Sequence, residues 1–218
     1  MQSAYLISFF LLLNISYSQD QFYTYERIDS TLHAWQEMFG YTSHPSDDYD
    51  GFGVIYNLDT IGYSSQDNLP IYAVKLSAHA DIKEAQPRVL ILGQCHAEEI
   101  YGVEISMEII NQFLHPEQFQ ENRTFLQKGL YFTEIWIVPT YNPEGLRVVH
   151  GEVGNGIQDV TYRKNKRDTN YNDIFDYEVG IGHDIDGVDL NRNYDFNWFF
   201  GDTLLQPCNA CSYDDDYD

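Results

Sequence analysis

Apolar side chains recur at helical spacing in two stretches of the chain. The first stretch, residues 22–39, is followed by Gly40, and glycine commonly ends a helix. The second stretch runs from Ile100 to Leu114 and stops before Pro116, which cannot continue a helix. Both stretches are therefore predicted to be helices that pack through one apolar face. The apolar positions of the first are Tyr25, Ile28, Leu32, Trp35 and Phe39.

Shorter apolar runs predict strands. They cover residues 52–57, 71–76, 88–93 and 130–139. The run at 88–93, "RVLILG", is almost continuously apolar, which is typical of a strand buried on both faces. The order strand–helix–strand predicts an α/β domain with a mixed central sheet flanked by helices. The polar stretches 41–51 and 151–187 are expected to be loops, and the length of the second favours a functional loop.

Charge and the N-terminus narrow the class of protein. The chain has 218 residues, with 34 acidic against 12 basic side chains and a formal net charge of −22. Such a chain is repelled by nucleic acid and by anionic membrane surfaces. Residues 1–18 hold an apolar run and then Ser16-Tyr17-Ser18, a small-x-small pattern, so they are expected to be a secretory signal peptide. Residues 19–218 would form the mature domain, secreted or periplasmic and not membrane-bound.

Three cysteines fit an exported chain. Cys208 and Cys211 are close enough in sequence for a short disulfide, which would leave Cys95 free. A zinc knuckle would need a second pair of ligands, and the sequence has none. Asn122-Arg-Thr124 is a glycosylation acceptor if the source glycosylates such sites.

A histidine and a glutamate follow the predicted strand 88–93. In "GQCHAEE", His96 would sit at the carboxyl end of the strand and Glu99 would open the next helix. Ligands in open α/β sheets bind outside the strand ends, and imidazole and carboxylate both suit Zn²⁺. His44 with Asp47 and His183 with Asp186 have the same spacing, but neither pair lies at a strand-to-helix junction. The alternative is a plain pair of surface residues.

Three further segments carry polar chemistry. "NPEG" (142–145) follows a strand and by itself indicates a turn. "YRKNKR" (162–167) gathers four basic residues and is either an anion site or a solvated loop that neutralises nearby acids. In "GVDLNRNY" (187–194), Asn191 and Arg192 can grip a carboxylate, or Arg192 can pair with an acid such as Asp189.

In this order, the four segments resemble the zinc carboxypeptidases of the carboxypeptidase A and B type. "HAEE" is similar to that family's His-x-x-Glu motif, "NPEG" to its Asn-Pro-Asp-Gly turn, and "YRKNKR" to its Trp-Arg-Lys stretch. "GVDLNRNY" is similar to its Val-Asp-x-Asn-Arg-Asn segment, the most specific of the four. The resemblance covers roughly residues 22–206.

The resemblance implies a function and a role for each matching residue. His96 and Glu99 would be two ligands of one Zn²⁺ ion, and Arg163 would stabilise the oxyanion that forms during hydrolysis. Asn191 and Arg192 would hold the C-terminal carboxylate of a peptide or protein substrate. Glu98 stands where the family often has Arg, which is expected to shift the subsite preference toward basic or neutral residues.

The family's remaining machinery is expected downstream. Its third zinc ligand, a tyrosine and the general base follow the Asn-Arg segment, and neither His150 nor His183 has the context of the missing ligand. The chain therefore resembles the N-terminal part of the catalytic domain, with a sheet that is incomplete toward the C-terminus. As given, it is expected to bind zinc weakly and to turn over little.

Two other functions fit part of the pattern. Deacylases related to carboxypeptidases share His-x-x-Glu and an Arg clamp but act on N-acyl amino acids. A carboxypeptidase-like domain without catalysis would bind ligands only, with acidic loops such as Asp184–Asp189 taking Ca²⁺. The glycine spacing of that loop does not match an EF-hand.

Overall fold

The computed structural model describes residues 22–177 and 186–194. Its helices are α2 (Tyr25–Phe39), α3 (Tyr101–Leu114), α4 (Arg123–Phe132) and α5 (Pro143–His150). Its strands are β1 (Tyr56–Tyr63), β2 (Pro70–Leu76), β3 (Arg88–Gln94) and β4 (Glu134–Thr140). The short 3₁₀ helices are η1 (Asp47–Tyr49), η2 (Pro116–Gln118) and η3 (Leu190–Arg192). No helix within these ranges has the length and apolar character needed to cross a membrane.

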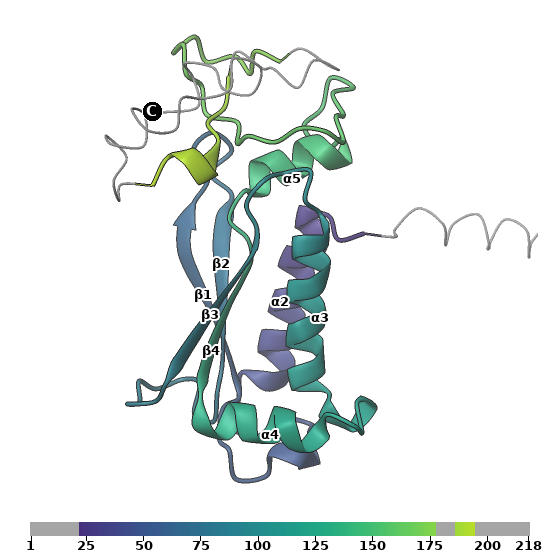
Figure 1. Ribbon diagram of the computed structural model, residues 1–218, viewed down its shortest axis with the longest axis vertical. Coiled ribbons are helices and arrows are strands. Elements are labelled where there is room, and N and C mark those ends of the chain that lie inside the picture. The colour runs from purple at the N-terminus through teal and green to yellow at the C-terminus, as the bar shows by residue number, and fades with distance from the viewer. Residues whose placement is uncertain (1–21, 178–185, 195–218) are drawn as a thin grey trace, which may run out of the picture.

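The described strands form one mixed sheet in the order β1-β2-β4-β3. The pairs β1–β2 and β2–β4 are antiparallel, whereas β3–β4 is parallel. A parallel pair needs a long crossover connection, and here α3, η2 and α4 supply it. Figure 1 shows α2 and α3 side by side along one face of the sheet. The predicted α/β fold with a mixed sheet is therefore confirmed.

Helix α2 follows its predicted pattern closely. All five apolar positions predicted for its face are buried. Thr24 caps the first turn, because its side chain accepts a hydrogen bond from the backbone N–H of Arg27. Gly40 ends the helix as expected, with its N–H bonded to the carbonyl of Gln36 at 2.9 Å. The apolar face of α2 thus joins the main core under the sheet.

Strand β3 differs from its prediction. It lies at the edge of the described sheet, next to β4 alone. Val89, Leu90 and Leu92 are 47%, 64% and 47% exposed, so the prediction of a strand buried on both faces is wrong for the described structure. An apolar run shows that a segment can be buried, but the position of a strand in its sheet depends on the other strands present.

Three predicted boundaries also differ. The strand predicted at 52–57 is β1, which starts later and runs to Tyr63. Residues 130–132 end α4 instead of opening a strand, because Leu126 and Leu130 bury one helical face. The chain changes to extended backbone at Thr133, and β4 follows. The turn predicted at 142–145 is the start of helix α5.

The topology brings two chain segments to one end of the sheet. Because β3 and β4 are parallel, the residues that follow these two strands emerge at the same end of the sheet. Helix α5 and the connections around it lie at this end in Figure 1, and α4 lies at the other. The candidate site residues after β3 therefore face the segments that follow β4.

Candidate functional site

The turn between β3 and α3 is tightly packed. A Cβ atom on Gly93 would lie 2.3 Å from the carbonyl oxygen of Pro139 and 2.9 Å from that of Gly102, so only glycine fits there. The buried amide of Gln94 donates to the carbonyl of Ala97 at 2.7 Å and accepts from the Thr140 hydroxyl at 2.6 Å. These contacts fix the backbone that carries His96.

His96 lies at this strand-to-helix junction, as the sequence predicts. It is buried, and its Nε2 lies 3.1 Å from Oδ1 of Asp189. Its Nδ1 is 3.2 Å from Oε1 of Glu99 and has no hydrogen-bond partner among the described residues. Glu99 is exposed and precedes the helix, because α3 begins at Tyr101 and not at Glu99. The two candidate metal ligands therefore converge.

Arg163 lies beside this pair. Its Nε donates to Oδ2 of Asp189 at 2.8 Å, and its Nη1 donates to Oε1 of Glu98 at 3.2 Å. Burial opposes the charge of the guanidinium, but these two carboxylates raise the pKa of Arg163 overall. Burial alone would raise the pKa of Asp189, yet the bonds from Arg163 and from the backbone of Asn191 hold that pKa below its usual value. Asp189 therefore stays ionised between the imidazole and the guanidinium.

Asn142 ties three segments together at the start of α5. Its carboxamide oxygen accepts from the N–H of Gly145 at 3.1 Å, which caps the helix. Its Nδ2 donates to the carbonyls of Cys95 and Lys164, both at 3.0 Å. The turn before His96 and the segment that holds Arg163 are thus fastened to one buried side chain.

Gly187 lets the segment before Asp189 approach the Arg163 segment. Its φ of +95° lies in a region that favours glycine, and a Cβ there would meet the carbonyl oxygen of Asn165 at 2.4 Å. The Asn165 side chain accepts from the N–H of Val188 at 2.8 Å. This contact fixes the distance between Arg163 and Asp189.

Asn191 and Arg192 lie in η3, next to Asp189 in sequence. The backbone N–H of Asn191 donates to Oδ1 of Asp189 at 2.9 Å, but both side chains are exposed. Among the described residues, the Arg192 guanidinium donates only to the carbonyl of Asn191. The structure thus brings His96, Glu99 and Arg163 together. The side chains of the predicted carboxylate clamp, Asn191 and Arg192, are exposed beside them. Asp189 pairs with Arg163, not with Arg192.

The residues present fit part of a zinc site. Two ligands bound to Zn²⁺ at about 2.1 Å with a tetrahedral angle lie roughly 3.4 Å apart. The distance between Nδ1 of His96 and Oε1 of Glu99 is 3.2 Å, and that nitrogen is buried without a hydrogen bond to the described residues. Within 22–177 and 186–194, however, no three His, Cys, Asp or Glu side chains are grouped to hold a metal. The described chain supplies a pair of donors, whereas a catalytic zinc takes three protein ligands.

Several predictions fall on residues that the structure does not describe. They concern the signal peptide at 1–18, His183 and the pair Cys208 and Cys211. In the loop suggested for calcium, Asp186 instead accepts from Thr169 and from the N–H of Asp176. Its oxygens therefore bind backbone and hydroxyl groups of the described chain.

Two residues that organise the site do not stand out in the sequence. The sequence suggests Asp189 only as a partner for Arg192, although it joins His96 to Arg163. Asn142 fits a turn by its motif, although it is a helix cap that holds two other segments. Both lie inside recognisable motifs, but their partners are distant in sequence and only the fold reveals them.

Comparison with known proteins identifies the family of the chain. The family model for zinc carboxypeptidases matches residues 50–216. The chain belongs to the zinc carboxypeptidase family. It is 29% identical over 157 residues to a zinc carboxypeptidase of Saccharothrix mutabilis subsp. capreolus, an alignment that covers 72% of this chain and 30% of that protein. It is 28% identical over 132 residues to the carboxypeptidase N catalytic chain of Mus musculus, covering 60% of this chain and 24% of that one.

Two solved structures have a fold similar to that of this chain. Carboxypeptidase A from Helicoverpa armigera superposes with a TM-score of 0.56 at 22% identity, covering 83% of this chain and 36% of that one. Thrombin-activatable fibrinolysis inhibitor gives a TM-score of 0.56 at 19% identity, covering 81% and 35%. The chain thus spans less than half the length of these relatives, and the likeness to these structures shows the fold.

Proposed function

We propose that this zinc carboxypeptidase family member contributes to an exported metallocarboxypeptidase that removes C-terminal residues from peptides. One observation carries the proposal. Asp189 holds His96 Nε2 at 3.1 Å and Arg163 Nε at 2.8 Å, so a candidate metal ligand and a fixed cation share one anchor. Metal-assisted hydrolysis of an amide uses side chains that ligate the metal, and a fixed positive group near the carbonyl stabilises the negative charge that develops on its oxygen.

His96 and Glu99 would hold the metal. When Nε2–H donates to Asp189, Nδ1 keeps its lone pair and faces Glu99. A bound Zn²⁺ would supply a water of lowered pKa and would polarise the carbonyl. In this proposal, the remaining ligand and the general base come from outside the described residues.

Arg163 would bind the carbonyl oxygen of the substrate as it gains negative charge. Two carboxylates already orient its planar guanidinium, so little reorganisation is needed when the substrate arrives. Asn191 and Arg192 are exposed, so their side chains can reach the terminal carboxylate of a peptide. Such a clamp fixes the distance from the chain end to the bond that is cleaved.

A matched pair of substrates tests the function. The complete protein that the gene encodes is loaded with zinc and given a peptide with a free C-terminus and the same peptide amidated. We expect loss of the last residue from the free acid alone, measured by mass spectrometry. Equal cleavage of the amide would contradict an exopeptidase with a carboxylate clamp, and hydrolysis of an N-acyl amino acid in place of the peptide would favour a deacylase. No hydrolysis of any of the three would favour a binding domain without catalysis.

A further inference from the structure

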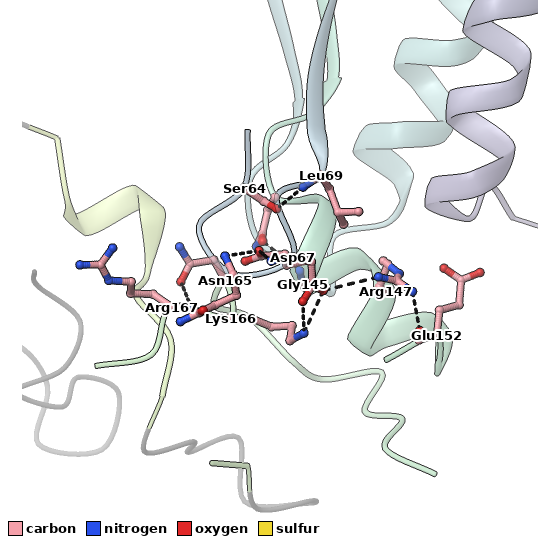
Figure 2. A network of polar contacts seen from close by, with 12 residues as sticks. Ser64, Asp67, Leu69, Gly145, Arg147, Glu152, Asn165, Lys166 and Arg167 are labelled. Atoms are coloured by element: carbon pink, nitrogen blue, oxygen red, sulfur yellow. Dashed lines mark hydrogen bonds and ion pairs between the residues drawn. The ribbon is translucent and has the colours of Figure 1, made fainter. Parts of the chain in front are cut away.

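A second polar network joins the loop between β1 and β2 to the segment that carries Arg163 (Figure 2). Both carboxylate oxygens of Asp67 lie 2.9 Å from Nζ of Lys166. The Lys166 side chain is only 10% exposed, and its Nζ lies 5.3 Å from the ring centroid of Phe175. The ammonium group is thus enclosed between a carboxylate and an aromatic face.

The backbone of Asp67 is held by a separate contact. The N–H groups of Gln66 and Asp67 both donate to Oε1 of Glu144 at 2.7 Å. Glu144 is buried in the first turn of α5, the same turn that Asn142 caps. At the base of the loop, the N–H of Leu69 donates to the hydroxyl of Ser64 at 2.8 Å. The Asp67 carboxylate therefore comes from a fixed loop, not from a free surface side chain.

Lys166 is close to Arg163 along a restrained segment. The carbonyl of Arg163 accepts from the N–H of Ala97 at 3.1 Å, and the N–H of Asn165 donates to the carbonyl of Val188 at 3.2 Å. A buried ammonium without its carboxylate is costly, because it must either lose its charge or move to water. Movement of Lys166 toward water would shift this short segment, and with it the guanidinium of Arg163.

We propose that Asp67 is a positioning residue for Arg163, acting through Lys166. This inference rests on the proposed function, because it gives Arg163 its role at the substrate carbonyl. It assigns to the β1–β2 loop a part in catalysis although that loop does not touch the candidate metal ligands. The Asp67 and Lys166 side chains set where the oxyanion-binding guanidinium stands.

Kinetics on the complete protein test the link. We expect Asp67→Asn to lower kcat by about tenfold or more with KM nearly unchanged, since a small misplacement of a catalytic group is costly. Asp81→Asn removes the same charge from an exposed position and should leave kcat unchanged. In an Arg163→Ala background, Asp67→Asn should cause no further loss of kcat. A further tenfold loss there would show that Asp67 acts by another route and would overturn the inference.

Two further measurements separate positioning from general damage. Asp67→Asn combined with Lys166→Met removes both charges of the pair, of which Lys166 is the buried member, and we expect it to recover part of the lost kcat; the longer contact of Asp67 with Arg147, at 3.5 Å, is absent from both variants. Hydrogen exchange at the amides of Asn165 and Arg167 should speed up in Asp67→Asn and stay unchanged in Asp81→Asn. Unchanged exchange at both amides in Asp67→Asn would overturn the inference even in a protein without activity. If Arg163→Ala alone left kcat intact, the proposed function would fail instead.

Discussion

The Nε2 atom of His96 lies 3.1 Å from Oδ1 of Asp189, a residue 93 positions later in the chain. The other oxygen of Asp189 binds Arg163 at 2.8 Å. A carboxylate that accepts from a metal-ligating histidine fixes the ring orientation and raises the basicity of the ligand nitrogen. The same side chain therefore governs both the metal donor and the cation of the candidate site.

Asp189→Asn should weaken zinc binding. A carboxamide has one accepting oxygen in place of the two that Asp189 uses, and it carries no charge, so the bonds to His96 and Arg163 cannot both persist in their present form. Loss of such an outer partner typically costs about 10- to 100-fold in metal affinity. Competition with a chromophoric chelator measures this, with Asp81→Asn as the control. Equal zinc affinity in the variant and the parent would contradict the role given to Asp189.

Asn142→Ala should destabilise the fold by more than the loss of a helix cap. It removes the cap of α5 and the donor to two carbonyls, that of Lys164 in a buried contact and that of Cys95 in a partly buried one. We expect the free energy of unfolding to fall by about 3 kcal/mol. Thr24→Ala removes the cap of α2 and a side-chain contact with Glu152, and it should cost about 1 kcal/mol. Urea denaturation of both variants gives the comparison, and equal losses would argue against the bridging role.

Gly187→Ala should separate the two segments around Arg163. The new Cβ would face the carbonyl oxygen of Asn165 at 2.4 Å and the Cβ of Lys164 at 2.9 Å. Gly154 has a similar φ of +83°, and a Cβ added there would have nothing within 4 Å, so Gly154→Ala reports the backbone cost alone. That cost is about 1 kcal/mol, and we expect Gly187→Ala to lose at least about 2 kcal/mol in thermal unfolding. A loss no larger than that of Gly154→Ala would show that the close approach is unimportant.

Glu152→Gln should stabilise the protein in a pH-dependent way. Burial, with a smaller contribution from neighbouring Glu26, raises the pKa of Glu152 to about 7 from an ordinary 4.5. Well below pH 4.5 the carboxyl is neutral in both states. As pH rises toward 7 the unfolded state ionises first, so folding stability falls.

The gain from Glu152→Gln should therefore be absent near pH 4 and fully present at pH 8. Denaturation of both proteins at the two pH values measures the difference. The exposed Glu121→Gln is the control. A gain that is the same at pH 4 and pH 8 would contradict the raised pKa.

The features that the sequence predicts best are those encoded locally. The apolar stripe of α2 and the position of His96 after a strand are both as expected, because spacing and flanking residues determine them. The secondary structure of residues 130–139 is harder to predict from the sequence. Tyr131 and Phe132 have strand propensity, but they complete helix α4, whose other face is buried.

The contacts of the candidate site need the fold. Nothing in the order of "GVDLNRNY" shows that Asp189 faces Arg163 while the side chain of Arg192 stays exposed. In the same way, the partners of Asn142 come from segments 47 residues before it and 22 residues after it. Sequence motifs indicate which segments form the candidate site, and tertiary packing decides which of their side chains are in contact.

Within the described residues β3 is an edge strand, and this affects how this part of the chain would behave in solution. Val89, Leu90 and Leu92 lie along backbone that can pair with another copy, and such edges promote intermolecular association. A formal net charge of −22 keeps copies apart, but salt shortens the range of that repulsion to about 8 Å at 0.15 M. Buffers of low ionic strength therefore suit purification, because they preserve the repulsion between copies, and salt is best added only after the protein has been purified.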